Sequence, residues 1–131
     1  MNTQSGLLRV KKIISEVPAY GKIIAVVIFL THGIADYITT LAAYLIAGNR
    51  GMSFSNVEKN PLLSEADPIG LLVIIIGSAG LISIVCLTSY YVIEKEGNRY
   101  NRLFAHVLFT LLASFGVYIV ANNVLFLAEF A

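Results

Sequence analysis

Three long apolar runs, at residues 23–47, 69–93 and 103–128, constrain the fold of this chain more than any other feature. Each exceeds the roughly 20 residues that an α-helix needs to cross the hydrocarbon core of a bilayer. Hydrophobic residues make up 57% of the chain and charged residues only 13%, whereas about a quarter of a soluble domain is charged. The sequence therefore predicts a single all-α domain: an integral membrane bundle of three transmembrane helices.

Residues 1–22 precede the first apolar run and are rich in basic side chains. Leu7, Val10 and Ile14 recur at helical spacing, and the basic residues lie off the face that they form. Pro18 marks the end of this pattern. We predict a short amphipathic helix at the surface of the lipid bilayer. Its basic residues either bind anionic lipid or set the topology while the helix packs under the bundle.

The basic residues also predict how the chain is oriented. The N-terminal segment and the loop at 94–102 carry four and three Lys or Arg residues. The loop at 48–68 carries two, and the C-terminal end carries none. Because basic residues are retained on the inner side of a membrane, we expect a multi-pass protein of the cell membrane with its N-terminus inside and its C-terminus outside.

The first span carries polar side chains that are unusual in a membrane helix: His32, Asp36, Thr39 and Thr40. A carboxylate at the centre of a bilayer costs several kcal/mol, so we expect Asp36 to have a partner inside the protein or its assembly. At an offset of four residues, His32, Asp36 and Thr40 share one face of a regular α-helix.

Counting residues along each span predicts what lies beside Asp36. With the inner ends of the spans level, a rise of about 1.5 Å per residue places Asp36 at the depth of Gly80 and Gly116. Tyr118 is among the nearest polar side chains on the third span, whereas His106 lies near the inner interface. The predicted polar network inside the membrane consists of His32, Asp36, Thr39, Thr40 and Tyr118.

Glycines on the second and third spans predict where helices pack closely. Gly77 and Gly80 bracket a cluster of small residues, and Gly116 occupies the third span. Small residues let helix backbones approach each other in a membrane. We therefore expect these three glycines to be helix-packing positions.

Two short motifs follow one another along the chain: Asp36-x-x-Thr39-Thr40 and Glu58-x-Asn60-Pro61-Leu62. Together they resemble a family of small archaeal and bacterial membrane proteins that is known only as a domain of unknown function. The resemblance covers about residues 32–75. It implies a small polytopic bundle and no established activity.

The second motif also predicts a pocket at the outer end of the bundle. Pro61 disfavours helical geometry at Asn60, which directs Glu58 and Asn60 from a turn back toward the bundle. With Asp36 and Asn122 they would line an outward-opening polar pocket. In the alternative interpretation, Asn60 and Pro61 only cap and start the second hydrophobic stretch.

These residues leave three functions open. In the first, the polar network fixes the register of the helices, and the protein is a structural or accessory subunit of a homo-oligomer or a larger membrane complex. In the second, it is a minimal transporter or channel that moves a cation or proton by way of Asp36 and the polar pocket. The third is an intramembrane metal-dependent enzyme, with His32, Asp36 and Glu58 as weak candidate ligands.

We favour the structural function. No catalytic residue is identified, and an enzyme is the least favoured class. No cofactor is predicted, although the weak ligand candidates leave a bound metal ion open. The expected partners are the lipid bilayer and other membrane subunits or copies of the chain, and no nucleic acid.

Overall fold

The computed structural model describes residues 3–130. Residues 1 and 2 of the predicted N-terminal segment, and residue 131, lie outside the described part. Helices form the described structure, without strands, which confirms the all-α fold class. The elements are α1 (Thr3–Glu16), α2 (Ala19–Ile28), η1 (Phe29–Ala35), α3 (Asp36–Asn49), η2 (Phe54–Asn56), α4 (Pro61–Ser64), α5 (Pro68–Glu96) and α6 (Arg99–Phe130).

Three helical stretches in the described part are long and apolar enough to cross a membrane: Ala19–Asn49, Pro68–Glu96 and Arg99–Phe130. The predicted spans at 23–47, 69–93 and 103–128 lie within them. The first stretch is continuous through α2, η1 and α3, and we call it the first rod. The third stretch continues without a break through Asn122 and Asn123 to Phe130.

Local sequence signals set the limits of α5 and α6. Asp67 accepts a hydrogen bond from the Gly70 N–H at 2.7 Å and caps α5, whose first residue is Pro68. Gly97 and Asn98 separate α5 from α6, and the Asn98 side chain accepts from the Asn101 N–H at 3.0 Å. So short a connection makes α5 and α6 antiparallel neighbours.

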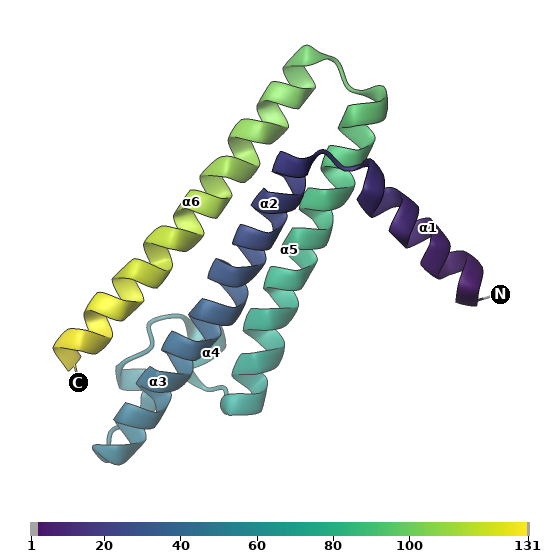
Figure 1. Cartoon of the computed structure of the whole chain (residues 1–131). Coiled ribbons are helices and arrows are strands. Elements are labelled where there is room, and N and C mark those ends of the chain that lie inside the picture. Colours follow the sequence, from purple (N-terminus) through teal and green to yellow (C-terminus); the bar gives the residue numbers. More distant parts are fainter. Residues whose placement is uncertain (1–2, 131) are drawn as a thin grey trace.

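The first rod packs against both other spans and runs antiparallel to α5 (Figure 1). We call the end at which α2 begins and α5 turns into α6 the turn end, and the opposite end, with residues 50–67, the loop end. One core cluster lies toward the turn end and includes Ile28, Cys86 and Phe109. A second cluster lies at the loop end and includes Leu71 and Ile75.

Between these clusters the first rod is a π-helix, η1, which the sequence did not predict. The Asp36 N–H bonds to the Thr31 carbonyl, five residues back, where a regular α-helix would bond four back. Thr31 Oγ1 also donates to the Val27 carbonyl at 2.7 Å. The wider turn rotates the residues after it, so counting at α-helical spacing does not give the direction of Asp36.

Only some of the predicted packing glycines face another helix of the chain. A Cβ added at Gly116 would overlap Thr31 Oγ1 and the His32 ring, so close approach of α6 to η1 requires glycine there. At Gly80 such an atom would meet only the Phe29 ring, at 3.8 Å, and at Gly77 it would meet nothing within 4 Å. The prediction that Asp36 lies beside Gly80 and Gly116 is therefore wrong: Gly116 faces His32.

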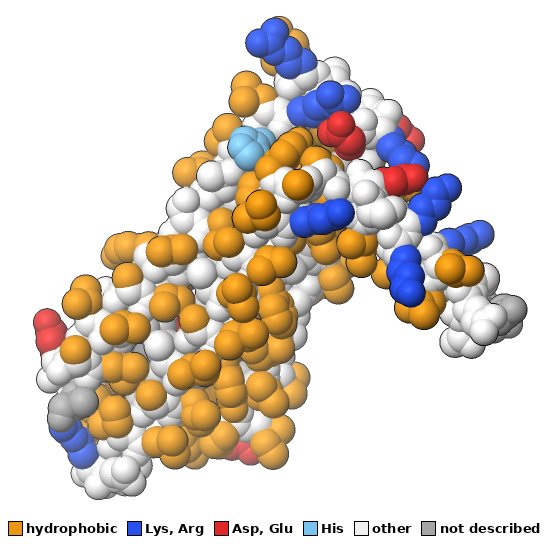
Figure 2. Space-filling model, in the orientation of Figure 1, with side chains coloured by type: hydrophobic (Ala, Val, Ile, Leu, Met, Phe, Trp, Pro, Cys, Tyr) orange, Lys and Arg blue, Asp and Glu red, His pale blue; other side chains and the backbone are white. Residues whose placement is uncertain are grey.

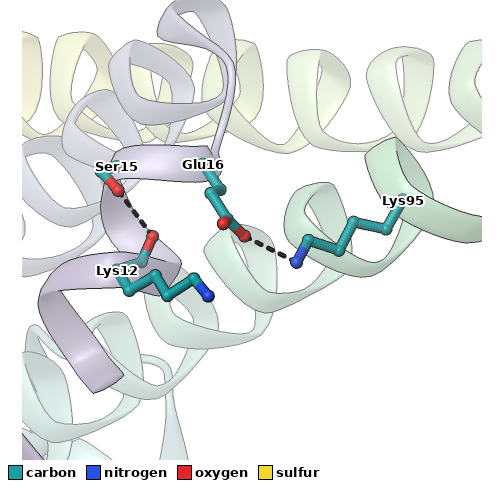
Figure 3. A network of polar contacts seen from close by, with 4 residues as sticks. All are labelled: Lys12, Ser15, Glu16 and Lys95. Atoms are coloured by element: carbon teal, nitrogen blue, oxygen red, sulfur yellow. Dashed lines mark hydrogen bonds and ion pairs between the residues drawn. The ribbon is translucent and has the colours of Figure 1, made fainter. Parts of the chain in front are cut away.

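α1 leaves the turn end of the bundle at a steep angle (Figure 1). At its base, Glu16 Oε2 lies 2.7 Å from Lys95 Nζ on α5, as Figure 3 shows. The adjoining Val17 is buried, at 3% exposure, in the turn-end core. The rest of α1 contributes no buried residue. An ion pair and one apolar anchor thus hold the base of α1 on α5.

We expect acid to loosen the base of α1. The hydrogen bond and the charge of the Lys95 ammonium lower the pKa of the Glu16 carboxyl from its ordinary value of 4.5. A group whose pKa is lowered in the docked state stabilises docking fully above its ordinary value and loses this effect as the pH falls through the lowered value. Spin labels on α1 and α5 should therefore report a constant separation from neutral pH down to the ordinary value and a larger one once the pH falls through the lowered pKa.

The Glu16→Gln variant is the control for this experiment. It should show the larger separation already at neutral pH and change little on acidification. An unchanged separation in the parent protein at low pH, or a docked α1 in Glu16→Gln, would contradict the role of the ion pair.

Candidate functional site

A polar network joins α3 to α6 toward the loop end of the bundle. Asn123 Nδ2 donates to Asp36 Oδ1 at 3.0 Å and to Thr39 Oγ1 at 3.1 Å. Thr40 Oγ1 donates to the same Asp36 oxygen at 3.4 Å. Thr39 and Thr40 are both buried. The carboxylate thus receives its donors from its own chain.

Thr39 is oriented by two kinds of contact. Its hydroxyl donates to the Ala35 carbonyl at 3.0 Å, one turn back along the helix. The hydroxyl oxygen is thereby left to accept from Asn123. Because the hydroxyl proton is engaged by the backbone, Thr39 presents an acceptor to α6, and the two acceptors Asp36 and Thr39 match the two N–H bonds of one amide group.

His32 belongs to a separate contact below this network. Its Nε2 lies 2.9 Å from the Leu112 carbonyl oxygen on α6. A carbonyl only accepts, so Nε2 carries the proton. The ring also lies against Phe115, with 6.3 Å between the ring centres. His32 therefore ties η1 to α6, and the described structure contains no hydrogen bond between His32 and Asp36.

Tyr118 lies outside the network, in contrast to the prediction. Its side chain is 64% exposed, and its ring stacks on Phe115 of the same helix. The partner of Asp36 is Asn123, more than one turn further along α6. Side chains on a helix lean toward its N-terminus, and this brings the Asn123 amide back to the level of Asp36.

A cavity of about 410 Å³ adjoins the network at the loop end. Its polar lining comes from Thr39, Thr40, Glu58, Lys59, Asn122 and Asn123, and its apolar lining from Ala43, Val57, Phe126 and Leu127. Of the predicted pocket residues, Glu58 and Asn122 thus lie at one cavity, whereas Asp36 does not line it. We call it the loop-end cavity. It contains both a carboxylate and an ammonium group, together with amides and hydroxyls.

Asn60 does not line this cavity. Its Oδ1 accepts from the Leu62 N–H at 3.0 Å and caps α4, which begins with Pro61. The Asn60 N–H in turn donates to Glu58 Oε1 at 2.8 Å. The capping interpretation therefore describes Asn60, with the difference that it caps the short α4 while Asp67 caps α5.

The weak candidate metal ligands occupy different surroundings. Within residues 3–130, no group of three or more His, Cys, Asp or Glu side chains is arranged to hold a metal ion. His32 uses Nε2 for the Leu112 carbonyl, and Asp36 faces Asn123. The arrangement supports hydrogen bonding between spans rather than a shared coordination shell.

Asn123 is the member of the site that sequence reasoning missed. Of the tandem amides, only Asn122 was predicted to take part, as a pocket residue. The apolar residues that follow, 124–128, continue the helix, so Asn123 lies inside an apolar stretch, and this continuity was the available signal.

No family model matches the chain, and no curated protein or solved structure is significantly similar to it. The resemblance of the two motifs to a family of unknown function therefore stays a prediction.

We expect Asn123→Ala to destabilise the bundle. The substitution removes both donors of the amide and leaves the Asp36 carboxylate with Thr40 alone. The expected loss in free energy of unfolding is about 1–2 kcal/mol, measured by reversible unfolding in mixed detergent micelles.

The matched control is Asn122→Ala, which removes the same amide from the neighbouring exposed position. It should change the free energy of unfolding by no more than about 0.5 kcal/mol. Equal effects of the two substitutions would contradict a specific role of Asn123.

Proposed function

We propose that this small membrane protein is a structural or accessory subunit of a membrane assembly. The observation that carries the proposal is the internal pairing of Asp36 with Asn123 and Thr40. An intramembrane carboxylate that serves transport faces a water-filled path or its cargo, whereas this one is used to hold two helices together. Its geometry favours a fixed bundle.

The surface of the bundle supports a place in an assembly. Within each of the three spans, only a minor part of an apolar stretch of 18 residues is buried inside the chain: 28%, 28% and 22%. Large aliphatic and aromatic side chains cover the rest, and hydrophobic side chains dominate the flank in Figure 2. Such faces are compatible with neighbouring transmembrane helices as well as with lipid. The partners that we propose are copies of the chain or other subunits.

The distribution of charge supports an orientation. The Lys and Arg side chains gather on α1 and at the turn end in Figure 2. By the positive-inside rule, we propose that the turn end lies inside and the loop end outside. The loop-end cavity then opens toward the outer surface.

A second candidate is a transporter for a cation or proton. The loop-end cavity favours it, because Glu58, Thr39 and Thr40 offer oxygen atoms beside the Asp36 network. These are the ligand types that hard cations take.

The two functions differ in what Asp36→Ala changes. A structural role predicts a several-fold fall in membrane abundance and in the assembled fraction in mild detergent, because the Asn123 amide and the Thr40 hydroxyl lose their common acceptor. It also predicts that liposomes containing the purified parent protein take up protons and monovalent cations no faster than empty liposomes. Tyr118→Phe, at an exposed position outside the network, is the control and should match the parent protein.

Two results would contradict the proposal. One is ion uptake by the pure parent protein that Asp36→Asn abolishes while the protein stays folded, which is the result expected for a transporter. The other is a parent protein that is isolated under mild conditions as a stable lone monomer.

A further inference from the structure

A second cavity, of about 520 Å³, lies at the turn end of the bundle. It is lined by Tyr20 on the first turn of α2 and by Arg99, Arg102, Leu103 and His106 on the first turns of α6. We call it the turn-end cavity. No acidic residue lines it, and its polar lining consists of two guanidinium groups, a phenol and an imidazole.

The aromatic side of this cavity is held in place by ring contacts. The Tyr20 ring lies edge-on to the His106 ring, with 5.2 Å between the centres, and edge-on to Tyr90, at 5.5 Å. His106 Nδ1 lies 3.4 Å from the Tyr90 hydroxyl. Nε2 is therefore the polar atom of His106 that has no hydrogen-bond partner among the described residues.

The two arginines are not paired with carboxylates. Among residues 3–130, Glu16 and Lys95 form the one ion pair, at the base of α1. Arg102 Nη2 makes a long hydrogen bond, 3.4 Å, to the Glu94 carbonyl. Two guanidinium groups three residues apart on one helix face the same cavity, an arrangement that suits bidentate binding of phosphate.

The surface around the cavity is apolar on the side of the span. Leu103 is 60% exposed and Phe104 70% exposed on the same turns of α6. A ligand with a phosphate group and long apolar chains would match both the cavity and the surface next to it.

We propose that the turn-end cavity binds the headgroup of an anionic phospholipid. The phosphate lies between Arg99 and Arg102, and Tyr20 and His106 supply neutral donors. The acyl chains run along the exposed apolar side chains of α6. This site is independent of the structural function proposed above, because a subunit and a transporter would both carry it.

Native mass spectrometry in detergent tests the site directly. The purified protein is mixed with phosphatidylglycerol or phosphatidylcholine, and the fraction that retains one lipid is measured. The parent protein should prefer phosphatidylglycerol, and Arg99→Gln with Arg102→Gln should weaken its retention by at least about tenfold. The matched control, Lys11→Gln with Lys12→Gln, removes the same charge from α1 outside the cavity and should retain the lipid.

Three results would overturn the proposal: equal retention by the arginine variant and the parent, equal loss in both double variants, or no preference between the two lipids. Displacement of the lipid by millimolar inorganic phosphate would identify a site for free phosphate instead and would also overturn it. Circular dichroism checks the fold of each variant. If the glutamine variant is unfolded, Arg99→Lys with Arg102→Lys replaces it and should still lose retention several-fold, because lysine cannot bind phosphate bidentately.

Discussion

The hydrogen bond from Asn123 to the Asp36 carboxylate is the interaction on which the rest of the bundle depends. Asp36 lies inside a helix of membrane-spanning length, where an unpaired carboxylate costs several kcal/mol. The pairing sets the register of α3 against α6, because a slide of one turn, about 5.4 Å, would separate the two groups. In lipid, apolar faces alone specify such a register weakly, since lipid tails are as apolar as the side chains that they replace.

The first rod packs against both other spans, and three more hydrogen bonds along its length join it to them. The Ser83 hydroxyl donates to the Ala25 carbonyl at 3.2 Å, and His32 donates to the Leu112 carbonyl at 2.9 Å. The Tyr37 hydroxyl donates to the Pro68 carbonyl at 3.3 Å. The π-helix lies at the centre of this pattern and brings the His32 ring against Gly116. The two cavities lie at opposite ends of the rod, where loops and helix ends supply polar side chains that the middle of the spans lacks.

Length and apolarity were enough to predict the three membrane-length helices, and Pro18 marked the end of the N-terminal helix, since these signals are local. The partner of Asp36 was not predicted, because it depends on how two distant helices slide and on the π turn at Phe29–Ala35, which no residue pattern announces. Counting residues along regular α-helices placed Asp36 at the depth of Gly116, which instead faces His32. Glu58 and Asn122 do line one cavity, whereas the Asn60 side chain accepts from the Leu62 N–H instead. Its position before Pro61 is compatible with either a pocket residue or a helix cap, so the sequence did not decide between them.

A double-mutant cycle at Asp36 and Asn123 tests the central claim most directly. The free energy of unfolding is measured for the parent protein, for Asp36→Ala, for Asn123→Ala and for the double variant in the same mixed micelles. If the two side chains hold α3 to α6, the two single substitutions will lower the free energy of unfolding by amounts whose sum exceeds the loss in the double variant by about 1 kcal/mol. Effects that add within about 0.3 kcal/mol would show that the two residues act independently and would contradict the account.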